Sequence, residues 1–171
     1  GELEKIVDSE GFAKEDWCEN SLVIEADSKN KKAVEDIERL KSLLDETLQH
    51  YDNGDVHGLL GAIISMPEEL ENTVKGRTKE KPNGDSPNWY DWRWSNWGTK
   101  WDVDCDFTMI NPFRMEFDFN SAWAPPIPWL EQVGKLFPNL FLCLTYDEPG
   151  MCFKGCACGI GEIVDNYEEY A

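Results

Sequence analysis

Five of the eight tryptophans of this chain fall within thirteen residues, from Trp89 to Trp101. So much aromatic surface has to be covered by other parts of the fold, because a helix that faces water on one side does not need it. A short helix can be bounded here at both ends. Ser86 can be the N-cap, Pro87 the first helical residue and Gly98 the left-handed residue past the end. We therefore predict a Trp-rich helix over residues 87–97 that packs as an aromatic wedge between two layers.

The other use of these rings, a stacking platform for nucleic-acid bases, conflicts with the charge of the chain. The sequence has 34 acidic and 16 basic residues, which gives a formal net charge of -18. This charge disfavours contact with nucleic-acid phosphates and anionic membranes, and it favours a basic protein partner. No apolar run approaches the length of a membrane span, and residues 1–16 lack the basic start and apolar core of a signal peptide. We therefore expect a cytoplasmic protein.

The Trp-rich stretch is also where the chain resembles a known family. Trp92–Asp102, with the sequence WRWSNWGTKWD, is similar to the most distinctive motif of the YubB-like family, a ferredoxin-like domain in uncharacterised proteins of phages and conjugative plasmids. Further segments agree in the same order, namely Asp16–Asn20, Met66–Leu70, Ser121–Pro128 and Tyr146–Met151. The resemblance implies one ferredoxin-like domain over residues 16–171, after an N-terminal extension over residues 1–15, in an accessory protein of a mobile element. It implies no particular reaction.

The remaining elements follow from hydrophobic periodicity and turn residues. They are a strand at 18–26, a helix at about 30–50 capped by Asp27 or Ser28, a strand at 59–64, a helical turn at 66–70, a hairpin at 101–109 and 113–119, a helix at 128–137, a strand at 140–146, an extended segment at 151–160, and an edge strand or tail at 162–171. Residues 75–87 are predicted to be a mobile loop. This order indicates an α+β fold of the ferredoxin-like split βαβ type, with an antiparallel sheet, two main helices and the inserted Trp-rich helix.

The predicted hairpin carries a row of acids that alternate with apolar residues, so that one face of it is core and the other faces water. If Met109 lies opposite Phe113, five carboxylates share the outer face: Asp102, Asp104, Asp106, Glu116 and Asp118. Opposed like charges are destabilising, so water and salt, a metal ion or a basic side chain has to offset them. We expect this acidic face to meet a basic protein of the host or the plasmid.

The six cysteines do not require disulfides, because a chain of 171 residues can build a sufficient apolar core. We therefore expect reduced thiols. Cys152, Cys156 and Cys158 are weak candidates for a metal site, with Cys143 or Cys105 as a fourth ligand. Their spacing lacks the paired pattern of structural zinc sites, so we predict neither a metal nor another cofactor. In an extended segment Cys156 and Cys158 would share one face, where they can be small core residues.

Catalytic motifs are sparse. The chain has two histidines, no nucleophile elbow and no phosphate-binding loop. An enzyme or small-ligand binder would have to use a cleft between the Trp-rich helix and the loop at Tyr146–Met151. The candidate residues of that cleft are Asp91, Trp92, Arg93, Asp147 and Glu148. A structural role explains the same positions equally well, with Asp91 and Arg93 as an ion pair and Asp147 as a turn residue. We therefore favour a non-enzymatic interaction module and keep the cleft as the alternative.

Overall fold

The computed structural model describes residues 16–48, 54, 56–73 and 87–171. The expected N-terminal extension and residues 75–86 of the expected loop lie outside the described residues. The described strands form one seven-stranded sheet in the order β2-β3-β4-β1-β5-β6-β7. All neighbouring strands in this sheet are antiparallel.

The strands are β1 (Trp17–Glu25), β2 (Val56–His57), β3 (Asp104–Asn111), β4 (Arg114–Ala122), β5 (Phe141–Glu148), β6 (Phe153–Ile160) and β7 (Val164–Glu169). The helices are α2 (Lys31–Thr47), α3 (Leu59–Ile63), α4 (Trp89–Asn96) and α5 (Ile127–Leu136), with a 3-10 turn η1 at Glu68–Leu70. Strands β3, β4, β1 and β5 with helices α2 and α5 form the predicted split βαβ arrangement. The predicted α+β ferredoxin-like fold class is therefore confirmed, and β2, β6 and β7 extend the sheet at its two edges.

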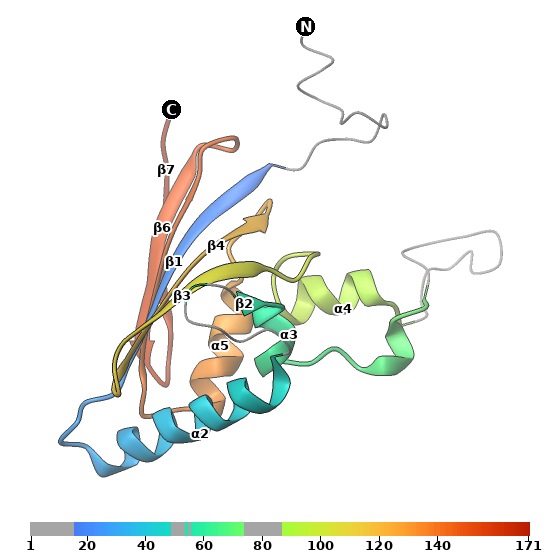
Figure 1. Cartoon of the computed structure of the whole chain (residues 1–171). Coiled ribbons are helices and arrows are strands. Elements are labelled where there is room, and N and C mark those ends of the chain that lie inside the picture. Colours follow the sequence, from blue (N-terminus) through green and yellow to red (C-terminus); the bar gives the residue numbers. More distant parts are fainter. Residues whose placement is uncertain (1–15, 49–53, 55, 74–86) are drawn as a thin grey trace, which may run out of the picture.

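The helices cover only one face of the sheet. Figure 1 shows α2, α3, α4 and α5 on the same side of it, with α2 running beneath the strands. Between these helices and the sheet lies an apolar core that includes Leu22, Ile37, Phe117, Trp129 and Leu144. The opposite face of the sheet is left without a covering layer of described helices. No helix in the described ranges is long and apolar enough to cross a membrane.

The apolar run at 59–64 is a helix, so the prediction of a buried strand there is wrong. Gly58, with φ of 77°, turns the chain into α3. The carboxylate of Asp102 accepts hydrogen bonds from the backbone N–H groups of Leu60 (2.8 Å) and Gly61 (2.9 Å). These are donors that the first turn of a helix cannot satisfy by itself. A short continuous apolar run does not distinguish strand from helix, and the cap comes from a residue about forty positions away.

The main helix α2 and the hairpin depart from prediction in detail. Asn30 caps α2, because its side chain accepts hydrogen bonds from the N–H groups of Lys32 and Ala33; Asp27 and Ser28 precede the cap. In the hairpin Met109 lies opposite Met115 rather than Phe113, with an irregularity between Met109 and Asn111. The strands are therefore offset by two residues from the predicted register, and an even offset keeps each side chain on its predicted face.

The Trp-rich helix begins later than predicted. Asn88 is the N-cap of α4, and its side chain accepts the N–H of Asp91, whereas Ser86 lies outside the described residues. Gly98 adopts the predicted left-handed conformation, with φ of 83°. Of the clustered tryptophans only Trp97 is fully buried, and its indole N–H donates to the carbonyl of Ile64 at 2.8 Å. The helix itself has no fully buried residue, so it lies along one layer rather than between two.

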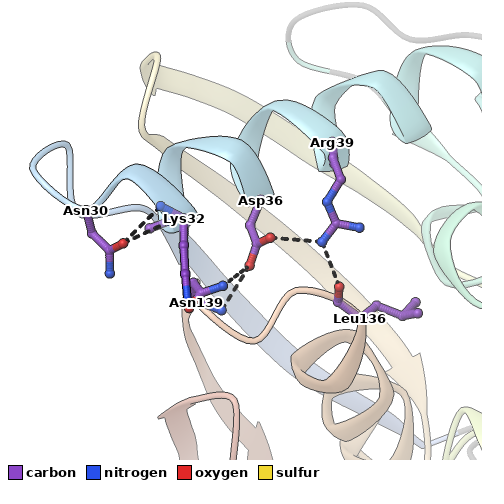
Figure 2. Close-up of polar contacts among 7 residues, drawn as sticks. Asn30, Lys32, Asp36, Arg39, Leu136 and Asn139 are labelled. Atoms are coloured by element: carbon purple, nitrogen blue, oxygen red, sulfur yellow. Dashed lines mark hydrogen bonds and ion pairs between the residues drawn. The ribbon is translucent and has the colours of Figure 1, made fainter.

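A buried carboxylate joins the two main helices. Asp36 on α2 accepts hydrogen bonds from Arg39 and from both the backbone and side-chain N–H groups of Asn139, as Figure 2 shows. Arg39 in turn donates to the carbonyl of Leu136 at the end of α5. Burial acts to raise the pKa of Asp36, but these hydrogen bonds outweigh it and the pKa lies below its ordinary value. The network fixes α2 against the segment that leads from α5 into β5.

Candidate functional site

The open face of the sheet is hollowed into a groove of about 1130 Å³. Residues of β1, β3, β4, β5, β6 and β7 line it, so the groove crosses most of the sheet. Along each strand, alternate side chains point to this face while their neighbours enter the core. In β1, for example, Trp17 and Glu19 are exposed on the open face, whereas Cys18 and Asn20 are buried.

Carboxylates dominate the polar lining of this groove, which we call the acidic groove. Among the described residues, Lys154 is the one basic residue in the lining. Six of the lining carboxylates lie on strands, namely Glu19, Asp104, Asp106, Asp118, Asp147 and Glu168. Asp106 lies directly opposite Asp118 across β3 and β4. Like charges at such positions repel each other, so the groove concentrates negative potential.

Basic partners in the described structure are placed at the margins of this face. His57 lies 3.2 Å from Asp104 through its Nδ1 atom. Arg114 pairs with Glu25 at 2.7 Å and with Glu116 at 3.0 Å, at the far end of β4. Within the described residues, no ion pair reaches Asp106 or Asp118. The β3 and β4 side of the acidic groove therefore holds two carboxylates, Asp106 and Asp118, that no described basic side chain pairs with.

The structure divides the five carboxylates of the predicted acidic face. Asp104, Asp106 and Asp118 lie on the outer face of the hairpin and line the groove, while Glu116 is paired with Arg114. Asp102 lies at the margin of the groove, but its oxygens cap α3 and also accept the N–H of Val103. Burial raises the pKa of Asp102, and the backbone hydrogen bonds act against that rise. Asp102 thus has a structural role, and it precedes β3 instead of alternating within it.

The rim of the groove at β5 to β7 holds a second polar group. Lys154 on β6 lies opposite Asp147 on β5 and Glu168 on β7. The hydroxyl of Tyr170 donates to Asp147 at 2.5 Å. This hydrogen bond, with some burial, raises the pKa of Tyr170 to about 12. Asp147, predicted as a cleft residue, is therefore a groove residue.

The other predicted cleft residues have separate partners. On α4, Asp91 accepts from the side chain of Asn88, and Arg93 donates to the carbonyl of Lys100 at 3.1 Å. The Arg93 guanidinium lies over the rings of Trp89 and Trp97, at 5.0 and 5.1 Å from their centroids. Trp92 packs edge-on against Trp97. These contacts support the structural interpretation of the Trp-rich helix.

Glu148 is the last residue of β5, directly before the turn that leads to β6. It is fully buried, and its Oε1 atom accepts the N–H groups of Gly150 and Met151. Burial raises the pKa of Glu148 despite these hydrogen bonds, and the nearby Asp16 and Asp147 add to the rise. The hydrogen bonds of Glu148 thus hold a turn, and they do not connect it to α4.

The prediction of six reduced thiols is wrong, because Cys143 on β5 forms a disulfide with Cys158 on β6. The two residues lie directly opposite each other in the sheet, with Cα atoms 4.1 Å apart. Cys156 shares the face of Cys158 as predicted, but that face is the open one, and it is Ala157 that enters the core. Cys152 stands apart in the preceding turn, where it is exposed and its thiol donates to the carbonyl of Pro149.

Trp17, Glu19 and Glu168 are among the groove residues that escaped the sequence analysis. Glu19 could have been found from the alternation of polar and apolar residues in the first predicted strand, at 18–26. Glu168 gives no such indication, because the C-terminal segment has no apolar period and its strand is exposed throughout.

The topology and this open face define an α+β protein with a ferredoxin-like sheet and a carboxylate-lined groove. Residues 96–169 match the family model described as a ferredoxin-like domain in Api92-like protein. The crystal structure of protein api92 from Yersinia pseudotuberculosis is similar, with a TM-score of 0.48 and 19% sequence identity. The match covers 66% of this chain and 39% of that chain, so it spans well under half of the solved protein. No curated protein matches this chain.

Proposed function

We propose that this chain is a non-enzymatic interaction module whose acidic groove receives a basic segment of a partner protein. The observation that carries this proposal is the pair Asp106 and Asp118. They face each other across β3 and β4, on one side of the groove, and have no ion-pair partner within the described residues. A cationic side chain that enters between them relieves a repulsion that the free protein has to bear. Binding energy is therefore available at this point.

The open, extended shape of the groove favours a polypeptide over a small molecule. Small-molecule sites are concave clefts of roughly 300 to 1,000 Å³ that bury most of the ligand. The acidic groove, at about 1130 Å³, is near the upper end of that range, and it is spread over six strands of an open face. An extended or helical basic segment fits such a surface, because its lysines and arginines can reach several carboxylates at once.

An exposed aromatic ring adds to the chemistry of the groove. Trp17 lines it and is 48% exposed. An arginine or lysine of the partner can lie over this indole, which contributes about 0.5 to 1 kcal/mol at an exposed site. Long-range attraction to the carboxylates mainly raises the association rate, while contacts such as this one slow dissociation.

The resemblance to proteins of phages and conjugative plasmids supports a basic partner protein that belongs to the host or to the mobile element. Many basic proteins of this kind bind nucleic acid, and a row of carboxylates can occupy the surface that meets phosphates. The activity proposed for the chain is thus to bind such a protein and compete with its nucleic acid.

The test compares two triple variants that remove the same amount of charge. The first is Asp104→Asn, Asp106→Asn and Asp118→Asn in the groove. The second is Glu35→Gln, Asp45→Asn and Glu46→Gln on exposed positions of α2. The probe is a fluorescent ten-residue oligolysine peptide, and its binding is measured by anisotropy at low and at moderate salt.

We expect the groove variant to bind about tenfold more weakly and to show a flatter salt dependence, because it has lost the local potential. The α2 variant should bind the peptide within about twofold of the unmodified protein, since screened charges contribute little at a distance. Equal losses in the two variants would show that only total charge matters and would overturn the proposal.

A further inference from the structure

Three cysteines meet on the open face where β5 pairs with β6. Cys156 and Cys158 occupy alternate positions of β6, so they project to the same side, and Cys143 lies opposite Cys158. The Sγ atom of Cys156 is 3.0 Å from that of Cys158 and 3.4 Å from that of Cys143. All three sulfurs lie within 4.8 Å of one another. We call this set the three-sulfur cluster.

The cluster is accessible and distinct from the other cysteines. Its three residues are half-buried, and Cys156 also lines the acidic groove. Thr145 lies opposite Cys156, with its hydroxyl 4.0 Å from the Cys156 sulfur. Cys18 and Cys105 are buried elsewhere in the sheet, and the thiol of Cys152 forms a hydrogen bond within its own turn.

The geometry suits a metal ion with three sulfur ligands. Metal–thiolate bonds of about 2.3 Å place three sulfurs around one ion roughly 4 Å apart. The cluster needs only small side-chain shifts to reach that spacing, because its sulfurs already lie within 4.8 Å. Thiolates select soft ions such as Cu(I), whereas structural zinc takes four protein ligands and the cluster supplies three.

We infer that, once the Cys143–Cys158 disulfide is reduced, Cys143, Cys156 and Cys158 bind one soft monovalent metal ion of the Cu(I) class. This inference does not rest on the proposed partner binding, although Cys156 lies in the wall of the same groove. It assigns the cysteines of β5 and β6 a common role, and Cys152 has no part in it.

The chemistry balances in two steps. A dithiol reductant delivers two electrons and two protons to the Cys143–Cys158 bond, which becomes two thiols while the reductant closes to its own disulfide. Cu(I) then replaces the protons of the three thiols without changing its oxidation state. Each ion bound therefore releases up to three protons, and the affinity rises with pH. Disulfide and metal compete for the same sulfurs, so the oxidised protein lacks the site.

The experiment uses the full chain, reduced with a dithiol that is then removed under anaerobic conditions. Cu(I) is supplied from its complex with bicinchoninate, and transfer to the protein is followed by the loss of colour of that complex. The variants are Cys156→Ser, which leaves the Cys143–Cys158 pair intact, and Cys152→Ser as the matched control outside the cluster. Circular dichroism verifies the fold of both variants.

We expect one Cu(I) per chain in the unmodified protein and in Cys152→Ser. Cys156→Ser should bind at least about tenfold more weakly, because loss of even a supporting residue of a metal site costs that much. Oxidised protein should leave the bicinchoninate complex intact. Unchanged transfer to Cys156→Ser, weakened transfer to Cys152→Ser, or equal transfer to oxidised protein would each overturn the inference.

Discussion

At the scale of single residues, the charges of this protein divide into those that hold the fold and those that face solvent. Asp36 is 5% exposed and receives three hydrogen bonds, one of them from a guanidinium. Asp45, on the same helix, is exposed. Hydrogen bonds to a buried carboxylate are stronger than neutral ones, and their loss leaves donors without an acceptor. The two aspartates therefore differ in what their replacement costs.

We predict that Asp36→Asn lowers the free energy of unfolding by about 1 to 3 kcal/mol, because the amide presents N–H groups to the Arg39 guanidinium. Asp45→Asn should stay within about 0.5 kcal/mol of the unmodified protein. Urea denaturation at neutral pH measures both. A variant of Asp36 with unchanged stability would contradict this account of the network.

The same substitution should alter the pH dependence. The pKa of Asp36 is lowered in the folded state, so its stabilisation is present above the pKa of the unfolded chain, near 3.9, and disappears as the pH falls through the folded value. The difference between the unmodified protein and Asp36→Asn should thus be constant near neutral pH and shrink below about pH 4.

At the scale of elements, periodicity predicted what is local and failed where a distant residue decides. Alternation in β3 and β4 and the 3.6-residue period of α2 depend on neighbours along the chain, and the structure contains all three elements. The apolar pattern of α3 predicts a strand, because the first turn of this helix depends on Asp102, which no local pattern connects with Leu60. The hairpin register likewise depends on an irregularity at Met109 to Asn111, which the turn sequence did not reveal.

The role of Asp102 gives a further prediction, and Asp104, two residues away, is its control. Asp102→Ala should lower the free energy of unfolding by about 1 to 3 kcal/mol, since the N–H groups of Leu60 and Gly61 lose their acceptor in a partly buried place. Asp104→Ala removes an exposed carboxylate and should change it by less than about 1 kcal/mol. Thermal melting of the two variants separates them, and equal melting temperatures would show that α3 does not need its cap.

At the scale of the whole molecule, the one-sided placement of the helices creates the candidate site. Because α2, α3, α4 and α5 lie on the same side, no described helix covers the other face of the sheet, which holds the charged side chains. The sequence pattern places Asp104, Asp106 and Asp118 on one outer face of a hairpin, which forms one side of the groove. Alternation places Glu19 on the exposed face of its own strand, but its position beside Asp147 follows from the pairing of β1 with β5, which joins segments more than a hundred residues apart. Such pairing leaves no trace in local periodicity.

The last prediction concerns the stability of this face. In the triple variant Asp104→Asn, Asp106→Asn and Asp118→Asn, the opposed pair of like charges disappears, which should add roughly 0.2 to 1 kcal/mol. Loss of the exposed contact between His57 and Asp104 costs little in return. The melting temperature, measured by calorimetry, should therefore equal or exceed that of the unmodified protein, with or without calcium or magnesium.

If the carboxylates instead bound one of these ions, the ion would raise the melting temperature of the unmodified protein, and the variant would lose that response. A lower melting temperature together with a lost metal response would thus identify an ion site and contradict a face that is open to a basic partner.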